Sequence, residues 1–338
     1  MNNTNDPLVS VVTPVYNGEK YLAECIESVV AQTYRNWEYA IVNNCSTDRT
    51  REIAERYARM HNRINVYNYE EFVDAIQNHN RALRLISPHS KHCKIVSADD
   101  WIYPECIERL VEVAEGHPSV GIVGSYALAG TKVRGIGLPL KINFFSGREV
   151  CRLRLLGANV IGSPTSLLFR ADVVRNEKAF FPGSAPNADI AACLRTLQYF
   201  DYGYVHQILS FERIHEESAS SGLMGFSPWL VDRIEFLVTY GDKYLTPEEF
   251  EKHMEELLAV YYESLAVGVV NFRNRKFWDY HKNRMHGIGI DLSYGRIAKA
   301  TIGKLLDLLL NPKQTIEKTL RRISAQGWNS GRAPWKIW

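Results

Sequence analysis

The sequence predicts an α/β protein with a doubly wound, mostly parallel sheet and a helical C-terminal extension. Strand-like and helix-like segments alternate with short connections across roughly the first 130 residues, the pattern of a parallel sheet covered by helices. From Pro228 onward the chain is predicted to be mostly helical. Polar clusters also follow several strands directly, and ligands of such sheets bind outside the carboxyl ends of the strands.

The elements of the first half can be assigned in order. Val9 to Tyr16 is β-branched and almost continuously apolar, as expected of a strand buried on both faces. Apolar residues between 21 and 30 then recur at helical spacing. Further strands are expected at WEYAIVNN, RINVYNY, CKIVSADD and VGIVGSYALA, and further helices at CSTDRTREIAERYARMH, at residues 72–86 and at PECIERLVEVAEGHP.

After Gly130 the alternation weakens. A Gly-Ser-Pro turn precedes a short strand in NVIGSPTSLLFRAD, a helix is expected at ADIAACLRTLQYFDYG, and a strand in YVHQILSFERIH leads into a polar loop. We therefore divide the chain into one domain over residues 1–225, with a first part (1–130) and a second part (131–225), and a helical region over residues 226–338.

Length and composition are those of an ordinary globular protein, with 338 residues, 46% hydrophobic and 23% charged. The six cysteines form no CxxC pair, which favours buried thiols in a reducing compartment. The N-terminus lacks the basic and apolar regions of a signal peptide, and no apolar run approaches the ~20 residues of a spanning helix. We expect a cytoplasmic protein, with peripheral attachment to the inner face of the membrane left open.

Two adjacent carboxylates, Asp99 and Asp100, follow the fourth predicted strand. The chain has neither a GxxxxGK[ST] loop nor a GxGxxG after its first strand, so a phosphate would have to be held by a metal ion. Carboxylate oxygens suit Mg²⁺ or Mn²⁺, which bridge to substrate phosphates. The alternative is a solvated turn in which one Asp caps the next helix, but the clusters PVYNG and NNCSTD at the same sheet edge favour the metal.

The segments VSVVTPVYNGEKYLAECIESVVAQTYRNWEYAIVNNCSTDRT and SADDWIYPECIERL resemble the inverting glycosyltransferases of family 2, which have the GT-A fold. The resemblance extends over roughly residues 9–221 and is more specific in the first half. It implies transfer of a sugar from a nucleotide diphosphate-sugar, expected to be UDP-linked, to a hydroxyl of a glycan or lipid-linked acceptor. Residues 1–130 would then hold the nucleotide, and residues 131–225 the acceptor and the catalytic base.

The resemblance also implies roles for single residues around the nucleotide. Pro14 and Tyr16 fall where the family packs the nucleobase, for which aromatic stacking is suitable chemistry. Asn44 falls where an Asp commonly reads the base edge; an amide can still pair with a pyrimidine because it both donates and accepts. Asp99 resembles the residue near the ribose and the metal. The structural alternative for Tyr16 is a tyrosine at the edge of the core.

Asp100 resembles the direct ligand of a Mn²⁺ or Mg²⁺ ion, and His215, in ERIHEES, resembles a histidine that approaches the metal or the diphosphate. Many relatives have a further Asp where this chain has Ser97. The alternative for His215 is a solvated loop histidine. Asn80 and His79 match an Asn-containing helix of the family less well, and a structural role is equally compatible with their position.

Asp189 is the candidate catalytic base. An acceptor hydroxyl has a pKa far above 7, so a carboxylate must take its proton as the sugar bond breaks. The family's base lies at the start of a helix in this region, and Asp189 follows the irregular stretch FPGSAPN at a predicted helix start. Its structural alternative is helix capping or pairing with the helix dipole.

The C-terminal tail carries the basic charge of the chain. Residues 291–338 contain nine Lys/Arg and three Asp/Glu, a net charge of +6, and therefore residues 1–290 carry −4. GRIAKATIGKLLDLLL is amphipathic, and three Trp follow it, a composition that suits an anionic membrane surface. The alternative is a helix packed on the catalytic domain or across a homodimer interface. We expect no nucleic-acid partner, because the basic charge is terminal.

Two other functions remain to be separated from sugar transfer. A nucleotidyltransferase would be expected to have a glycine-rich basic phosphate loop, whereas TPVYNGEKY has one Gly and one Lys. A catalytically degenerate nucleotide-sugar-binding scaffold would be consistent with the departures at Asn44, Ser97 and Ala188, but the presence of Asp99, Asp100 and Asp189 together argues against it.

Overall fold

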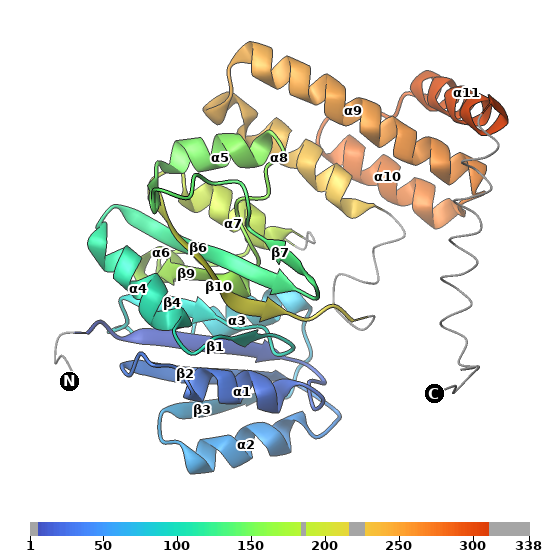
Figure 1. Ribbon diagram of the computed structural model, residues 1–338. Helices are drawn as coiled ribbons and strands as arrows, with labels where there is room; N and C mark the ends of the chain where they lie inside the picture. Colours follow the sequence, from blue (N-terminus) through green and yellow to red (C-terminus); the bar gives the residue numbers. More distant parts are fainter. Residues whose placement is uncertain (1–5, 184–186, 216–226, 311–338) are drawn as a thin grey trace, which may run out of the picture. The chain divides into compact units, whose positions relative to one another are not determined.

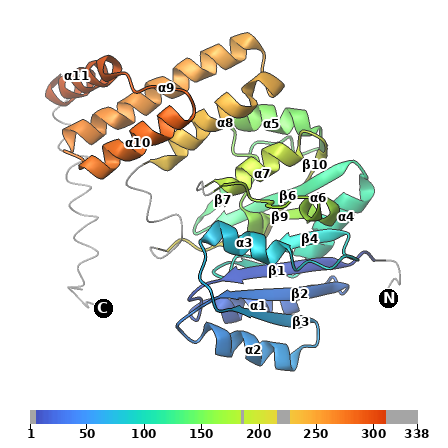
Figure 2. The same cartoon turned by 180° about the vertical axis from the view of Figure 1, so that it is seen from behind.

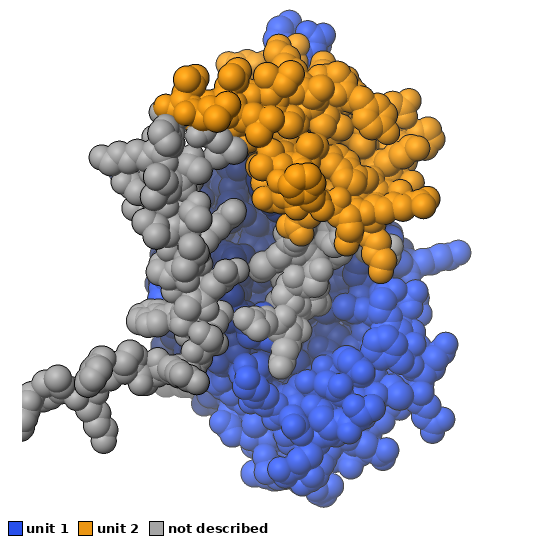
Figure 3. All heavy atoms as spheres, turned by 90° about the vertical axis from the view of Figure 1, so that its right-hand side faces the viewer, with its two compact units in different colours: residues 1–251 blue, residues 252–338 orange. Residues whose placement is uncertain are grey.

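The structure is a computed structural model that describes residues 6–183, 187–215 and 227–310. The chain forms two compact units, residues 1–251 and residues 252–338 (Figure 3). The strands are β1 (Val9–Val15), β2 (Trp37–Asn44), β3 (Ile64–Tyr69), β4 (His92–Ile95), β5 (Trp101–Ile102), β6 (Val120–Ala129), β7 (Lys132–Arg134), β8 (Phe144–Phe145), β9 (Leu167–Arg170) and β10 (Asp201–Glu212). The helices are α1 (Leu22–Val30), α2 (Thr50–Met60), α3 (Ala75–Leu83), α4 (Cys106–Gly116), α5 (Gly147–Leu155), α6 (Ala171–Arg175), α7 (Ala188–Thr196), α8 (Pro228–Tyr244), α9 (Pro247–Val270), α10 (Arg275–Gly287) and α11 (Tyr294–Leu310).

The sheet of the first unit has the order β3-β2-β1-β4-β9-β6-β10-β5, with β7 paired to β6 and β8 paired to β10. β1 is parallel to β2 and β4, β2 to β3, and β6 to β10. β9 runs antiparallel between β4 and β6, so these two strands point the same way without touching. The long strands of the first 130 residues therefore share one direction, as predicted, and the short strands make the sheet mixed.

Helices cover both faces of this sheet. α4 lies in front of the strands in Figure 1, and α3 lies in front of them in the opposite view (Figure 2). The apolar stripe of α1, from Leu22 to Val29, is buried in the same core cluster as residues of α2 and α4. Side chains cap several helices; for example, Asp74 accepts from the amide of Gln77 at α3, Ser146 caps α5, and Asn274 caps α10.

The second unit is helical. It contains most of α9, together with α10 and α11. Tyr261 and His281 are buried in it, and the hydroxyl of Tyr261 lies 3.0 Å from Nδ1 of His281. The backbone amide of Ser293 donates to the hydroxyl of Tyr262 at 3.0 Å, which ties the start of α11 to α9. Within the described residues, no helix is long and apolar enough to cross a membrane.

Candidate active site

The carboxyl ends of β1, β2 and β4 meet at one edge of the sheet, where the predicted residues lie. Pro14 is buried within β1 opposite Val42 of β2. Tyr16, the first residue after β1, is 49% exposed and meets the ring of Phe72 edge-on, with 4.8 Å between the ring centroids. Phe72 is itself 56% exposed and was not among the predicted site residues. Two exposed aromatic rings in contact at this edge could hold a flat base between or against them.

Asn44 supports this aromatic pair. It is buried at the end of β2, its Nδ2 donates to the carbonyl of Val73 at 2.8 Å, and its Oδ1 accepts from the amide of Val73 at 3.1 Å. Both halves of the amide are thus used by the residue that follows Phe72. A buried side chain paired in this way fixes the loop after β3. Its implied role in reading a base edge stays a prediction.

Asp100 is the most constrained carboxylate at this edge. It is 7% exposed, its Oδ2 accepts from the hydroxyl of Thr165 at 2.6 Å, and its Oδ1 accepts from the amide of Arg213 at 3.0 Å. Burial and then the charge of Asp99 raise the pKa of Asp100 to about 7, although the Thr165 and Arg213 hydrogen bonds oppose this. The end of β10 is therefore attached to the turn that carries both aspartates.

Asp99 and His215 form the second contact between these segments. Nε2 of His215 lies 2.9 Å from Oδ2 of Asp99. Nδ1 of His215 is buried and has no hydrogen-bond partner in the described part of the chain. Arg213 donates from Nε to the carbonyl of Asp99 at 3.1 Å, and its guanidinium lies over the ring of Tyr21 at 4.4 Å. The predicted metal ligands Asp100 and His215 are thus brought together by Asp99 and Arg213.

A divalent cation fits the chemistry of these residues. Within the described residues, no three His, Cys, Asp or Glu side chains already converge as a complete metal site. However, among the residues that the structure describes, each Asp100 oxygen accepts one hydrogen bond, and Nδ1 of His215 has no partner. A buried carboxylate next to a second carboxylate is unfavourable unless a cation is near. Asp99, Asp100 and His215 therefore suit an ion such as Mn²⁺ or Mg²⁺, which takes its other ligands from water and phosphate oxygens.

The 3-10 helix Pro164–Ser166, within the GSPTS segment, forms the floor beneath Asp100. Thr165 is fully buried, and its hydroxyl donates a hydrogen bond to Asp100. Lys94 of β4 is also fully buried, and its Nζ donates to the carbonyl of Thr165 and, at 3.1 Å, to that of Leu167. Burial lowers the pKa of Lys94. This lysine therefore anchors the turn that orients the Asp100 carboxylate.

Asp189 lies at the start of α7, as predicted, and is partly buried. Its Oδ1 accepts from the amide of Ile190 at 2.8 Å. Burial raises the pKa of Asp189 to about 6, against the lowering effect of the Ile190 amide and of the Arg154 charge. A carboxylate with such a pKa is ionised at neutral pH and still a better proton acceptor than an ordinary aspartate.

Glu212 is a site residue that the sequence analysis missed. It ends β10, is 8% exposed, and accepts from the hydroxyl of Ser163 at 2.6 Å. Its charge raises the pKa of both Asp100 and Asp189, so Glu212 is close enough to both for their charges to interact. The signal in the sequence was an acidic residue next to Arg213 at the end of a predicted strand.

Two other features lie outside this cluster. Asn80 is buried and exchanges hydrogen bonds with the backbone of Phe181, at 2.9 and 3.0 Å, which fits the structural interpretation.

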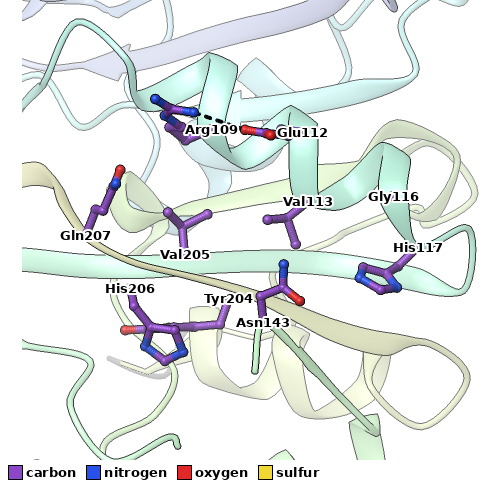
Figure 4. A pocket seen from close by; sticks show the side chains of 10 residues that line it. All are labelled: Arg109, Glu112, Val113, Gly116, His117, Asn143, Tyr204, Val205, His206 and Gln207. Carbon is purple, nitrogen blue, oxygen red and sulfur yellow. Dashed lines mark hydrogen bonds and ion pairs between the residues drawn. The ribbon is translucent and has the colours of Figure 1, made fainter. Parts of the chain in front are cut away.

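A cavity of about 480 Å³ lies between α4 and the middle of β10 (Figure 4). None of the predicted site residues lines this cavity. The residues that line the cavity are Arg109, Glu112, Val113, Gly116, His117, Asn143, Tyr204, Val205, His206 and Gln207.

Solved structures share this fold. TarS of S. aureus, residues 1–349 in complex with UDP-GlcNAc, matches with a TM-score of 0.62 at 19% identity, over 83% of this chain and 80% of that 1–349 chain. The mannosyltransferase PcManGT from Pyrobaculum calidifontis, in complex with GDP-Man and Mn²⁺, matches with a TM-score of 0.54 at 17% identity, over 97% of this chain and 89% of PcManGT. The predicted GT-A-type fold with a helical C-terminal region is confirmed.

Sequence comparison gives the family. Residues 10–177 match the family described as Glycosyl transferase family 2. GlyG, a glycosyltransferase of Streptococcus pneumoniae, is 34% identical over 35% of this chain but only 39% of GlyG, and the match covers 17% of GlyA from the same organism. TuaG of Bacillus subtilis, a putative teichuronic acid biosynthesis glycosyltransferase, is 36% identical over 64% of this chain and 82% of TuaG. With such a relative matched over most of its length, the chain belongs to glycosyltransferase family 2.

Proposed function

We propose that the protein is a metal-dependent, inverting glycosyltransferase of the hexosyltransferase type. It moves a sugar from a nucleotide diphosphate-sugar, UDP-linked, to a hydroxyl acceptor. The observation that carries this proposal is the grouping of Asp99, Asp100 and His215 at the edge of the sheet. Asp189 is near this group, because the charge of Glu212 acts on both Asp100 and Asp189. The named complexes of TarS with UDP-GlcNAc and of PcManGT with GDP-Man and Mn²⁺ support a nucleotide-sugar donor and a divalent cation.

The donor is placed by the nucleotide half of the site. Tyr16 and Phe72 offer exposed ring faces and edges to the base. Asn44 holds the loop that carries Phe72. In the sequence, Asp99 follows Tyr16 and Phe72 and precedes His215, which it contacts. In the proposed complex, Asp99 would be near the ribose. The residues Asp100 and His215 would hold the cation, which when bound stabilises the negative charge of the departing diphosphate.

The acceptor is activated by Asp189. Its pKa of about 6 leaves the carboxylate ionised at neutral pH, so it can take the hydroxyl proton as the new bond forms. A single displacement at the anomeric carbon inverts its configuration. Glu212 raises the basicity of Asp189 through its charge, and Ser163 fixes the Glu212 carboxylate.

The acceptor belongs, in this proposal, to surface polysaccharide or lipid-linked glycan synthesis, as the name of TuaG suggests. α11 supports a peripheral contact with an anionic membrane on its cytoplasmic face. Ile302, Leu305, Leu306 and Leu309 of this helix are 46% to 75% exposed, and Lys299 and Lys304 lie among them. Exposed apolar residues interspersed with lysines suit an anionic lipid surface. The rest of the basic tail, residues 311–338, lies outside the described residues.

The donor reaction separates this proposal from a binding scaffold and from a nucleotidyltransferase. The purified full-length protein is incubated with a panel of UDP- and GDP-sugars and Mn²⁺, and nucleoside diphosphate release is measured with and without EDTA. We expect release from one UDP-sugar, abolished by EDTA. Binding without release would support the scaffold, and release of pyrophosphate from a nucleoside triphosphate and a sugar phosphate would support the nucleotidyltransferase.

A further inference from the structure

Two arginines from different helices lie close together, and one of them, Arg154, interacts with Asp189. Arg154 lies on α5 and Arg233 on α8, and these helices pack against each other in the first unit. The charge of Arg233 lowers the pKa of Arg154, after the larger effect of burial, and the charge of Arg154 lowers that of Asp189. Arg154 is therefore close enough to interact electrostatically with both Arg233 and Asp189, and it links the second guanidinium to the carboxyl group.

Neither guanidinium has a partner that accounts for its position. Among the described residues, the side chains of Arg154 and Arg233 form no hydrogen bond and no ion pair, and Nε of Arg154 is buried without an acceptor. Other arginines of α5 are paired: Arg152 with Glu249, and Arg148 with the carbonyl of Lys243 at 2.9 Å. Adjacent, partly buried guanidinium groups are unfavourable unless oxygen acceptors satisfy their donors.

The backbone makes room for this pair. Gly157, just after α5, has φ +99°, and a Cβ atom there would lie 2.7 Å from Nη2 of Arg233. Glycine therefore permits both the left-handed backbone and the close approach of the guanidinium. Arg154 and Arg233 are each only partly buried, so neither residue is closed off from solvent.

We propose that Arg154 and Arg233 form a subsite for an anionic group, a phosphate or a carboxylate, on the acceptor. The proposal rests on the proposed function, because it places this group next to the base that activates the acceptor hydroxyl. Guanidinium groups bind such oxyanions through paired, charge-assisted hydrogen bonds. The anionic group belongs either to the phosphate of a lipid carrier or to a phosphate or uronic acid within the glycan.

The test measures anion binding while the donor site is filled. Full-length protein saturated with UDP and Mn²⁺ is titrated calorimetrically with three glycan probes, methyl glucuronide, ribitol 5-phosphate and neutral methyl glucoside, and with geranyl phosphate as the lipid-carrier probe. We expect at least one anionic probe to bind tenfold or more tightly than methyl glucoside. Whether geranyl phosphate or a glycan anion binds identifies the source of the charge.

The variants Arg154→Gln and Arg233→Gln should each weaken that anionic probe about tenfold or more, as expected for loss of a charge-assisted hydrogen bond. Arg154→Lys, which keeps the charge, should restore part of the affinity. Arg152→Gln is the matched control. It removes a positive charge from the same helix, but this charge is already paired with Glu249, so the variant should bind the probe as the wild type does. UDP binding with Mn²⁺ and the melting temperature monitor folding in every variant.

Two results overturn the subsite: no anionic probe binds better than methyl glucoside, or the glutamine variants bind the anion as tightly as the wild type and Arg152→Gln do. Failure of the proposed function looks different, because the wild type would then neither bind UDP with Mn²⁺ nor release UDP from any nucleotide-sugar.

Discussion

Replacing Asp189 with Asn should abolish sugar transfer and at the same time stabilise the protein at neutral pH. The substitution keeps the shape of the side chain and its acceptor for the amide of Ile190. It removes the group that takes the proton, a loss of about 10² to 10⁴-fold in rate for a general base. UDP binding with Mn²⁺ should be retained, because Asp189 does not contact Asp99, Asp100 or His215 by any hydrogen bond or ion pair between described residues.

The stability effect follows from the pKa of Asp189, which burial raises from 3.8 to about 6. The folded state therefore favours the protonated carboxyl, so this contribution to stability is present below pH 3.8 and is lost as the pH rises through about 6. A tenfold change in an ionisation constant corresponds to about 1.4 kcal/mol, so the largest gain in the free energy of unfolding is about 3 kcal/mol. Because Asp189 is partly exposed, we expect about 1 to 2 kcal/mol at pH 8 and about half of that at pH 5.

Thermal melting at pH 8 and pH 5, read together with UDP release, measures both effects. The melting temperature of Asp189→Asn should exceed that of the wild type by about 2 to 8 °C at pH 8. In the wild type, kcat/KM should fall about tenfold per pH unit below about 6. The reasoning is refuted if Asp189→Asn keeps near-normal turnover, or if it melts below the wild type at pH 8.

Further predictions concern the rest of the site. Asp100→Asn should lose Mn²⁺-dependent UDP binding in calorimetry, whereas unchanged affinity would remove Asp100 from the metal site. Thr165→Val removes the hydroxyl that donates to Asp100, and we expect Mn²⁺ to bind roughly tenfold more weakly with little change in UDP affinity without metal; equal Mn²⁺ affinity would contradict this. Tyr16→Ala should weaken the binding of UDP by about 1 to 3 kcal/mol, and uridine, which needs no metal, is the second ligand that isolates the contact with the base. Unchanged affinity for both ligands would exclude base stacking. Truncation at Gly295 should abolish co-sedimentation with anionic vesicles, and equal binding by the full-length and truncated chains would remove the membrane contact.

The sequence predicted the repeating part of the fold well, because that part depends on local patterns. The apolar run that begins at Val9 and the apolar stripe containing Leu22 and Val29 are each short patterns, and each indicates directly which side chains are buried. β9 was expected as a short strand, but its antiparallel position between β4 and β6 was not, since that pairing joins segments more than 40 residues apart. The short helix α5 was not predicted at all, and Arg154 was therefore not considered.

The candidate site shows the same division. Asp99, Asp100 and Asp189 could be singled out because acidic residues at strand and helix ends are visible in the sequence. The roles of Thr165 and Glu212 could not be predicted, because these roles come from hydrogen bonds to Asp100 and Ser163 across the sheet. The resemblance implies that Asn44 reads the base edge, which stays a prediction, and the structure adds that its amide is bonded to the backbone of Val73. Such contacts depend on the folded arrangement.

The configuration of the released sugar tests the central claim most directly. Wild-type protein with Mn²⁺ is given the α-linked UDP-sugar that the donor panel identifies, and the first product of its hydrolysis is followed by proton NMR before the free sugar equilibrates. A single displacement at this site predicts that the β-anomer forms first, with no signal when EDTA is present or when Asp189 is replaced by Asn. Initial formation of the α-anomer, or release that continues without Asp189, would contradict the account.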